Sequence, residues 1–137
     1  MLKITPNPNT AKHVPAAHGG IFSIKNPDEK IIDFSSNVNP LGCHPGVKKY
    51  LKKQLNQIHV YPDSESTCLR SNLKWFTGLN TSQILIGNGA TELIYNFCSA
   101  FVNKKTKVLI PCPTFSEYEK AVEFSGGKVI SFKTLNL

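Results

Sequence analysis

The spacing of apolar residues changes character part-way along the chain. Between residues 47 and 77 apolar side chains recur every three or four positions, which predicts two amphipathic helices. The first covers 47–58, and the second runs from an N-cap at Ser64 to about Thr77, with Gly78 ending it. From residue 84 onward, short apolar runs alternate with helical patterns. The expected elements are a strand at 84–86, a helix at 90–102, a strand at 108–110, a helix at 115–125 and a strand at 128–132.

This order of strands and helices, with short links, is typical of a parallel or mixed α/β sheet. Three strands with two covering helices leave sheet faces and edges open, so we expect residues 81–137 to be the start of a larger α/β domain that continues beyond Leu137. Residues 1–30 are expected to be an extended arm, because four prolines prevent a long helix there. Residues 31–80 would carry a loop, a short strand at 31–34 and the two helices.

The link between the strand at 84–86 and the following helix is rich in glycine. Gly87 and Gly89 allow a sharp turn, and the first N–H groups of a helix, with the helix dipole, attract an anion. A phosphate would fit against Gly89, Ala90 and Thr91. The loop is not a P-loop, because no lysine follows the glycines, and Glu92 stands where a dinucleotide fingerprint needs a third glycine. From this motif alone, a turn that only starts a helix is an equally good interpretation.

Composition narrows the possible partners. The 137 residues are 40% hydrophobic and 18% charged, as in a globular protein, and no apolar run approaches the length of a membrane span. The first twenty residues lack a signal-peptide core, so a cytoplasmic protein is expected. The net charge of +7 raises the question of nucleic acid, but the lysines are scattered and Arg70 is the sole arginine. Attraction of a phosphorylated small molecule, or a solvated lysine surface, explains the charge better.

The cysteines do not indicate a metal site. Cys43, Cys68, Cys98 and Cys112 form no C-x-x-C pair, and no histidine pair has zinc spacing. Cys98 lies on the apolar face of a predicted helix and is expected in the core.

Five short motifs follow one another along the chain. They are His18-Gly19-Gly20, Asp-Phe-Ser-Ser-Asn-Val-Asn-Pro-Leu-Gly at 33–42, Tyr61-Pro62-Asp63, Gly-Asn-Gly-Ala-Thr-Glu at 87–92, and Pro-Thr-Phe-Ser-Glu-Tyr at 113–118. Their order and spacing resemble the N-terminal part of fold-type I pyridoxal-phosphate (PLP) enzymes of the class I/II aminotransferase family. The first two motifs look most like the threonine-phosphate decarboxylases of cobalamin biosynthesis. The alternatives are a histidinol-phosphate aminotransferase and a catalytically inactive fragment.

The resemblance implies a role for each motif in cofactor binding. Gly89, Ala90 and Thr91 would hold the phosphate of PLP, and Phe115 would stack on its ring. Tyr61 would reach the cofactor phosphate of a neighbouring subunit, which implies a homodimer. From the residues alone, Phe115 at the start of a helix fits an ordinary core position better.

The same resemblance implies a phosphorylated amino-acid substrate, O-phospho-L-threonine, which would be decarboxylated to aminopropanol phosphate. Asn37 and the backbone at Leu41 and Gly42 would face its carboxylate or phosphate, and His18 and Gly19 would meet its phosphate. From the residues alone, the segment before Pro40 is equally an ordinary Asx turn.

No catalytic residue is assigned within the chain. The family's Schiff-base lysine, together with the aspartate and arginines of its active site, is expected beyond Leu137. Ser71-Asn72-Leu73-Lys74 has the letters of the lysine motif, but it precedes the phosphate-binding turn and is in the wrong place. The 137 residues alone are therefore expected to be inactive.

Overall fold

The computed structural model describes residues 5, 7–16, 18–20, 23–25 and 30–134. The chain divides into two compact units. One comprises Met1–Ala17 and Ile86–Leu137, and the other comprises His18–Leu85. We refer to them as the sheet unit and the helical unit.

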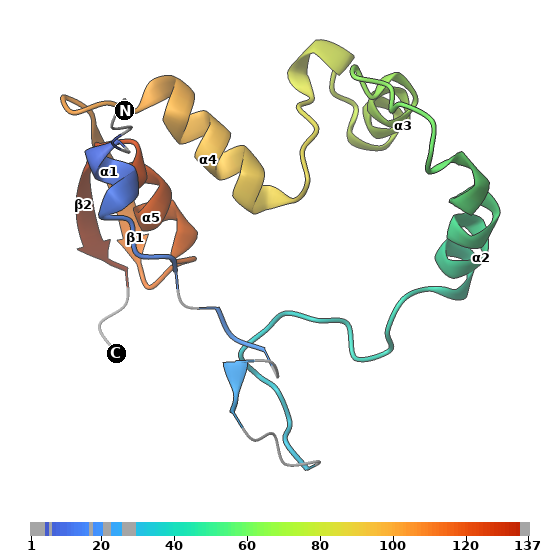
Figure 1. Cartoon of the computed structure of the whole chain (residues 1–137), viewed down its shortest axis with the longest axis horizontal. Helices are drawn as coiled ribbons and strands as arrows, with labels where there is room; N and C mark the ends of the chain where they lie inside the picture. Colours follow the sequence, from blue (N-terminus) through green and yellow to red (C-terminus); the bar gives the residue numbers. More distant parts are fainter. Residues whose placement is uncertain (1–4, 6, 17, 21–22, 26–29, 135–137) are drawn as a thin grey trace. The chain divides into compact units, whose positions relative to one another are not determined.

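The sheet unit contains a parallel pair of strands joined by a helix (Figure 1). Strand β1 (Lys107–Cys112) pairs along its whole length with β2 (Lys128–Lys133). Helix α5 (Glu117–Phe124) connects them and packs on both strands, and α4 (Ala90–Phe101) packs on α5. The two helices and the second and third expected strands are therefore confirmed, with ends that differ by a few residues.

Part of the expected extended arm is folded. Asn7 accepts a hydrogen bond from the N–H of Asn9 at 3.0 Å and caps a one-turn helix, α1 (Pro8–Ala11), in which proline occupies a first-turn position. Helix α1 contacts α5, and the ring of His13 meets Phe124 edge-on at 5.2 Å. The prolines exclude a long helix, but they do not prevent a single turn that packs on the sheet unit.

The core of the sheet unit is small and lies between α4, α5 and β1. Its buried members are Cys98, Val102, Ile110, Ala121 and Val122. Cys98 is 6% exposed, which confirms its expected core position, and burial raises the pKa of its thiol. All four cysteines are free thiols.

The strand expected at 84–86 does not form. Ile84 has extended dihedral angles (φ −113°, ψ 118°), but no segment of the described chain pairs with it, and Leu85 is 74% exposed. The strand expected at 31–34 is also absent, and Phe34 is 92% exposed. An apolar run favours extended backbone, but a strand needs a hydrogen-bonding partner, so the described sheet has two strands rather than three.

The helical unit contains both helices expected between residues 47 and 77. Helix α2 (Pro45–Gln54) continues into a 3₁₀ turn, η2 (Leu55–Gln57). Helix α3 (Thr67–Thr77) ends at Gly78, whose φ of 75° is the left-handed conformation that glycine adopts without strain. A further 3₁₀ turn, η3 (Thr81–Gln83), contacts α3.

The apolar faces of these two helices are not covered. On the apolar face of α3, Leu69 and Phe76 are 48% and 79% exposed and only Leu73 is half-buried. The apolar residues of α2 are exposed as well. Helical periodicity identifies the apolar face of each helix, but the short 3₁₀ turns that contact the helices leave most of these faces exposed.

The start of α3 is held by Asp63 rather than by Ser64. One carboxylate oxygen of Asp63 accepts from the N–H of Glu65 at 3.0 Å, and the other accepts from the N–H of Thr67 at 2.7 Å. The residue that precedes the helix, Ser66, has a left-handed backbone (φ 48°) and makes no capping bond with its side chain. Both Asp63 and Ser64 are good capping residues, and the turn geometry selects the carboxylate.

Asp63 should make the helical unit sensitive to acid. The hydrogen bonds from Thr67 hold the pKa of this carboxyl below its usual value, so its contribution is present at neutral pH and is lost as the pH falls through the lowered pKa. We expect Asp63→Asn to lower helicity at pH 7 and to flatten its decline between about pH 5 and pH 2. Circular dichroism of both proteins across this range tests it. Parallel pH profiles would show that Asp63 makes no such contribution.

Candidate functional site

The turn before α4 leaves the start of this helix open. Gly89 is the N-cap residue, with φ 90° and ψ 170°, and no side chain caps the helix from that position. A Cβ atom built on Gly89 would meet no other atom within 4 Å. The first N–H groups of α4 have no acceptor within the helix and carry the positive end of its dipole. The turn therefore offers both space and donors to an anion.

Glu92 stabilises this turn, a role that the sequence pattern did not indicate. Its Oε2 atom accepts a hydrogen bond from the backbone N–H of Asn88, so the carboxylate folds back from the first turn of α4 onto the preceding loop. Position 87 also favours glycine, because a Cβ atom there would lie 2.9 Å from Cγ of Leu93, too close for an undisturbed contact. An acid in the third position of a helix is the signal for a side chain that folds back on the preceding loop, although Gly89 has no side chain with which to complete a capping box.

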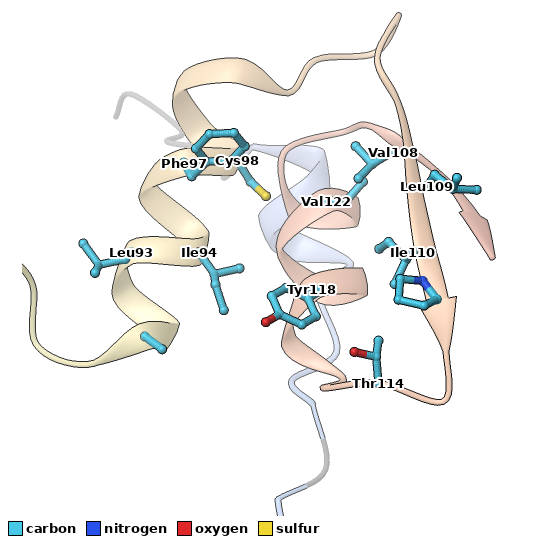
Figure 2. A pocket seen from close by; sticks show the side chains of 12 residues that line it. Leu93, Ile94, Phe97, Cys98, Val108, Leu109, Ile110, Thr114, Tyr118 and Val122 are labelled. Carbon is cyan, nitrogen blue, oxygen red and sulfur yellow. The ribbon is translucent and has the colours of Figure 1, made fainter. Parts of the chain in front are cut away.

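A groove of about 730 Å³ separates α4 from β1, with α5 at its floor (Figure 2). Its lining is largely apolar. Leu93 and Ile94 lie toward the same end of the groove as Thr114, whereas Phe97 and Cys98 lie toward the other end, with Val108. The start of α4, the end of β1 and the start of α5 therefore lie toward one end of the groove, with α4 and β1 on opposite sides of it (Figure 2).

Phe115 lies next to Thr114 at that end. It is 42% exposed, and its ring meets the ring of Tyr118 edge-on, with centroids 5.9 Å apart at 90°. This partial exposure is not that of a core residue. Phe115 thus lies in the same unit as Gly89, Ala90 and Thr91. Gly89 precedes the first residue of α4, and Phe115 lies just before the first residue of α5.

Two of the sequence motifs meet in the helical unit. The N–H of Gly20 donates to Oγ of Ser35 at 2.7 Å, and that hydroxyl donates to Asp33 at 2.6 Å. A Cβ atom on Gly19 would collide with Ser35, so the close approach requires glycine. Hydrogen bonds from Ser35 and then Ser36 hold the pKa of the Asp33 carboxyl below its usual value.

The other expected substrate residues lie on exposed loops of the helical unit. The Asx turn around Pro40 is made by Asn39, which accepts from the N–H of Leu41 at 3.1 Å and donates to the carbonyl of Gly42 at 3.0 Å. Asn37 and His18 are exposed, and Leu41 is 93% exposed.

Tyr61, assigned to the cofactor phosphate of a neighbouring subunit, is 91% exposed and belongs to the helical unit. The other expected cofactor residues, Gly89, Ala90, Thr91 and Phe115, all lie in the sheet unit.

No group of three His, Cys, Asp or Glu side chains in the described part of the chain is placed to hold a metal ion. No helix there has the length and apolar character needed to cross a membrane.

The comparison with known families is decisive. Residues 29–136 match the sequence pattern of the family described as "Aminotransferase class I and II". The chain belongs to this family. The family membership that the five motifs predicted is therefore confirmed. The family belongs to the fold-type I PLP enzymes.

Individual relatives of this aminotransferase-family chain carry one recurrent name. A histidinol-phosphate aminotransferase of Geobacillus sp. (strain WCH70) is 35% identical over 99 residues, which is 72% of this chain and 27% of the relative. The protein of the same name from Bacillus subtilis (strain 168) is 34% identical over 101 residues, 74% of this chain and 28% of the relative. The chain thus spans little more than a quarter of the length of these relatives.

A solved structure shows the same relationship. A protein from Erwinia carotovora atroseptica, named provisionally as a histidinol-phosphate aminotransferase, superposes with a TM-score of 0.68 and 25% identity. The match covers 73% of this chain and 29% of that protein. It confirms the expected fold class: an α/β N-terminal part of the fold-type I PLP-dependent transferase fold.

These findings refine the expectation from sequence. The cofactor of the family is PLP, as expected. The names of the relatives match the histidinol-phosphate aminotransferase alternative and give no support to a decarboxylase or to a role in cobalamin biosynthesis.

Proposed function

We propose that this chain is the N-terminal part of a PLP-dependent aminotransferase that acts on histidinol phosphate or a similar phosphorylated amine. The observation that carries the proposal is the open start of α4, with Gly89 at φ 90° and no side-chain cap. Thr114, which immediately precedes Phe115 in the chain, lies at the same end of the groove as this helix start (Figure 2). The names of the relatives supply the reaction class and the substrate.

The residues of the sheet unit fit the cofactor. The N–H groups of Ala90 and Thr91, with the Thr91 hydroxyl, would donate to its phosphate, in the space left by the missing side chain of Gly89. Phe115, partly exposed, would present a flat apolar surface to its ring. Glu92 is held on the N–H of Asn88, which directs its carboxylate into the loop. When bound, the cofactor acts as an electron sink for bonds at the amino-bearing carbon of the substrate.

The helical unit would contribute to the substrate and to a second subunit. The exposed side chain of Tyr61 is available to reach the cofactor phosphate of a neighbouring copy, so a homodimer is part of the proposal. The phosphate of the amine substrate, or a carboxylate of 2-oxoglutarate, would meet His18, Gly19, Asn37 and the backbone at Leu41 and Gly42. The net charge of +7 favours encounter with such an anion.

A threonine-phosphate decarboxylase is the second candidate. It rests on the likeness of the motifs at 18–20 and 33–42 to these enzymes, and the hydrogen bond from Gly20 to Ser35 shows that the two motifs lie together.

The two candidates differ in their products. We expect the natural protein that contains this chain to convert 2-oxoglutarate to glutamate in the presence of histidinol phosphate and PLP, without release of carbon dioxide. Coupled detection of glutamate and trapping of labelled carbon dioxide from O-phospho-L-threonine measure both reactions in one preparation. Release of carbon dioxide without any need for 2-oxoglutarate would contradict the aminotransferase and establish the second candidate. The 137 residues alone are expected to be inactive in both assays.

A further inference from the structure

A hydrogen bond joins α4, whose first turn contains Ala90 and Thr91, to the start of α5, which follows Phe115. The hydroxyl of Tyr95 on α4 donates to Oε2 of Glu117, the first residue of α5, at 3.0 Å. Glu117 is only 4% exposed. The ring of Tyr95 also packs edge-on against Phe124, with centroids 5.8 Å apart, and so lies within the fringe of the core.

The position of this bond relative to the site is informative. Tyr95 follows Ala90 by five residues, about 7 Å along the axis of α4. Glu117 follows Phe115 by two residues. The bond therefore fastens the helix whose start would bind the phosphate to the segment whose aromatic ring would face the pyridine.

Stability alone is a weak reason for such a pair. A buried carboxylate has a desolvation cost, and apolar residues of similar volume often replace buried charged groups without loss of stability. What a directional bond adds is a fixed distance and orientation between two elements. Burial, and to a lesser extent the hydrogen bond to Glu117, raises the pKa of Tyr95 to about 12. The hydroxyl therefore keeps the proton that it donates throughout the physiological pH range.

We propose that the hydrogen bond from Tyr95 to Glu117 is a positioning contact that fixes the phosphate-binding start of α4 relative to Phe115. It rests on the proposed function, because only a ligand that engages both ends at once depends on their separation. A ligand that uses the start of α4 alone should not sense the bond.

The test compares two ligands on the natural protein that contains this chain. Pyridoxamine 5′-phosphate spans both ends and, having no aldehyde, does not react with the lysines, whereas inorganic phosphate occupies the start of α4 alone. We expect Tyr95→Phe to weaken pyridoxamine 5′-phosphate about tenfold, the equivalent of one lost hydrogen bond to a charged group, and to leave phosphate affinity within about twofold. Glu117→Gln, which still accepts from the hydroxyl, should retain most of the affinity. Tyr50→Phe, on exposed α2, is the matched control.

Two outcomes would overturn the proposal. Equal weakening of both ligands by Tyr95→Phe would show a general loss of structure, and no weakening of either would show that the bond positions nothing. Amide hydrogen exchange adds a readout without ligand: Tyr95→Phe should speed exchange at the first turns of α4 and α5 and leave β1 and β2 protected. If the natural protein that contains this chain binds no pyridoxamine 5′-phosphate, the proposed function of these residues fails, while unchanged exchange in Tyr95→Phe would separately reject the positioning contact.

Discussion

Gly89→Val is expected to lower the affinity of the chain for pyridoxamine 5′-phosphate about a hundredfold. Gly89 has a φ of 90°, which a β-branched residue adopts only under strain. The binding-competent turn would become a minor conformation, and apparent affinity falls in proportion to its population. The new side chain would also occupy the open space beside the first N–H groups of α4. Isothermal titration of the native chain and the variant measures the effect.

Gly78→Val is a matched control for this substitution. Gly78 also has a positive φ, 75°, and a Cβ atom there would again meet nothing within 4 Å, but it ends α3 in the helical unit. We expect Gly78→Val to lower the thermal stability of α3 and to leave the affinity for the ligand unchanged. An unaltered affinity in Gly89→Val would show that the phosphate is not bound at the start of α4.

Local pattern was sufficient to locate α2, α3, α4 and α5, but not the one-turn helix α1 in the segment expected to be extended. The helix expected at 90–102 is α4, and the one expected at 115–125 contains α5, because helical periodicity and flanking glycines act within a few residues. The strand expected at 84–86 failed for the opposite reason. Ile84 has the extended backbone that its sequence favours, but strand formation depends on a partner elsewhere in the chain, which an apolar run does not identify.

In the candidate site, too, local features could be predicted from the sequence, and contacts between distant residues could not. The open turn at Gly89 follows from the positions of the glycines, and the sequence identified it. The role of Glu92 depends on a side chain that folds back on its own loop, and a local pattern could have revealed it. The bond between Tyr95 and Glu117 joins residues 22 positions apart, so only the packing of α4 on α5 reveals it. The choice of Asp63 over Ser64 depends on the left-handed backbone of Ser66.

Val122→Asp is expected to unfold the sheet unit. Val122 is 2% exposed and packs within the core formed by α4, α5 and β1. An unpaired carboxylate there would cost several kcal/mol, a large part of the roughly 5–15 kcal/mol that stabilises a typical domain. Amide hydrogen exchange should show the loss of protection in β1, β2 and α4. Val47→Asp, at a site 49% exposed on α2, is the control and should leave these amides protected.

The pH dependence of this variant separates a buried charge from a lost side chain. An apolar environment raises the pKa of a carboxyl, so the new aspartate would be tolerated best in its neutral form. Its destabilising effect should therefore grow as the pH rises above about 4, the pKa of an unperturbed aspartate, and should shrink in acid. Val122→Ala would also destabilise the unit, by lost packing, but without this dependence on pH. Full protection of the strands in Val122→Asp at pH 7 would contradict the core described for the sheet unit. Without that core, α4 and Phe115 would have no fixed relation to each other.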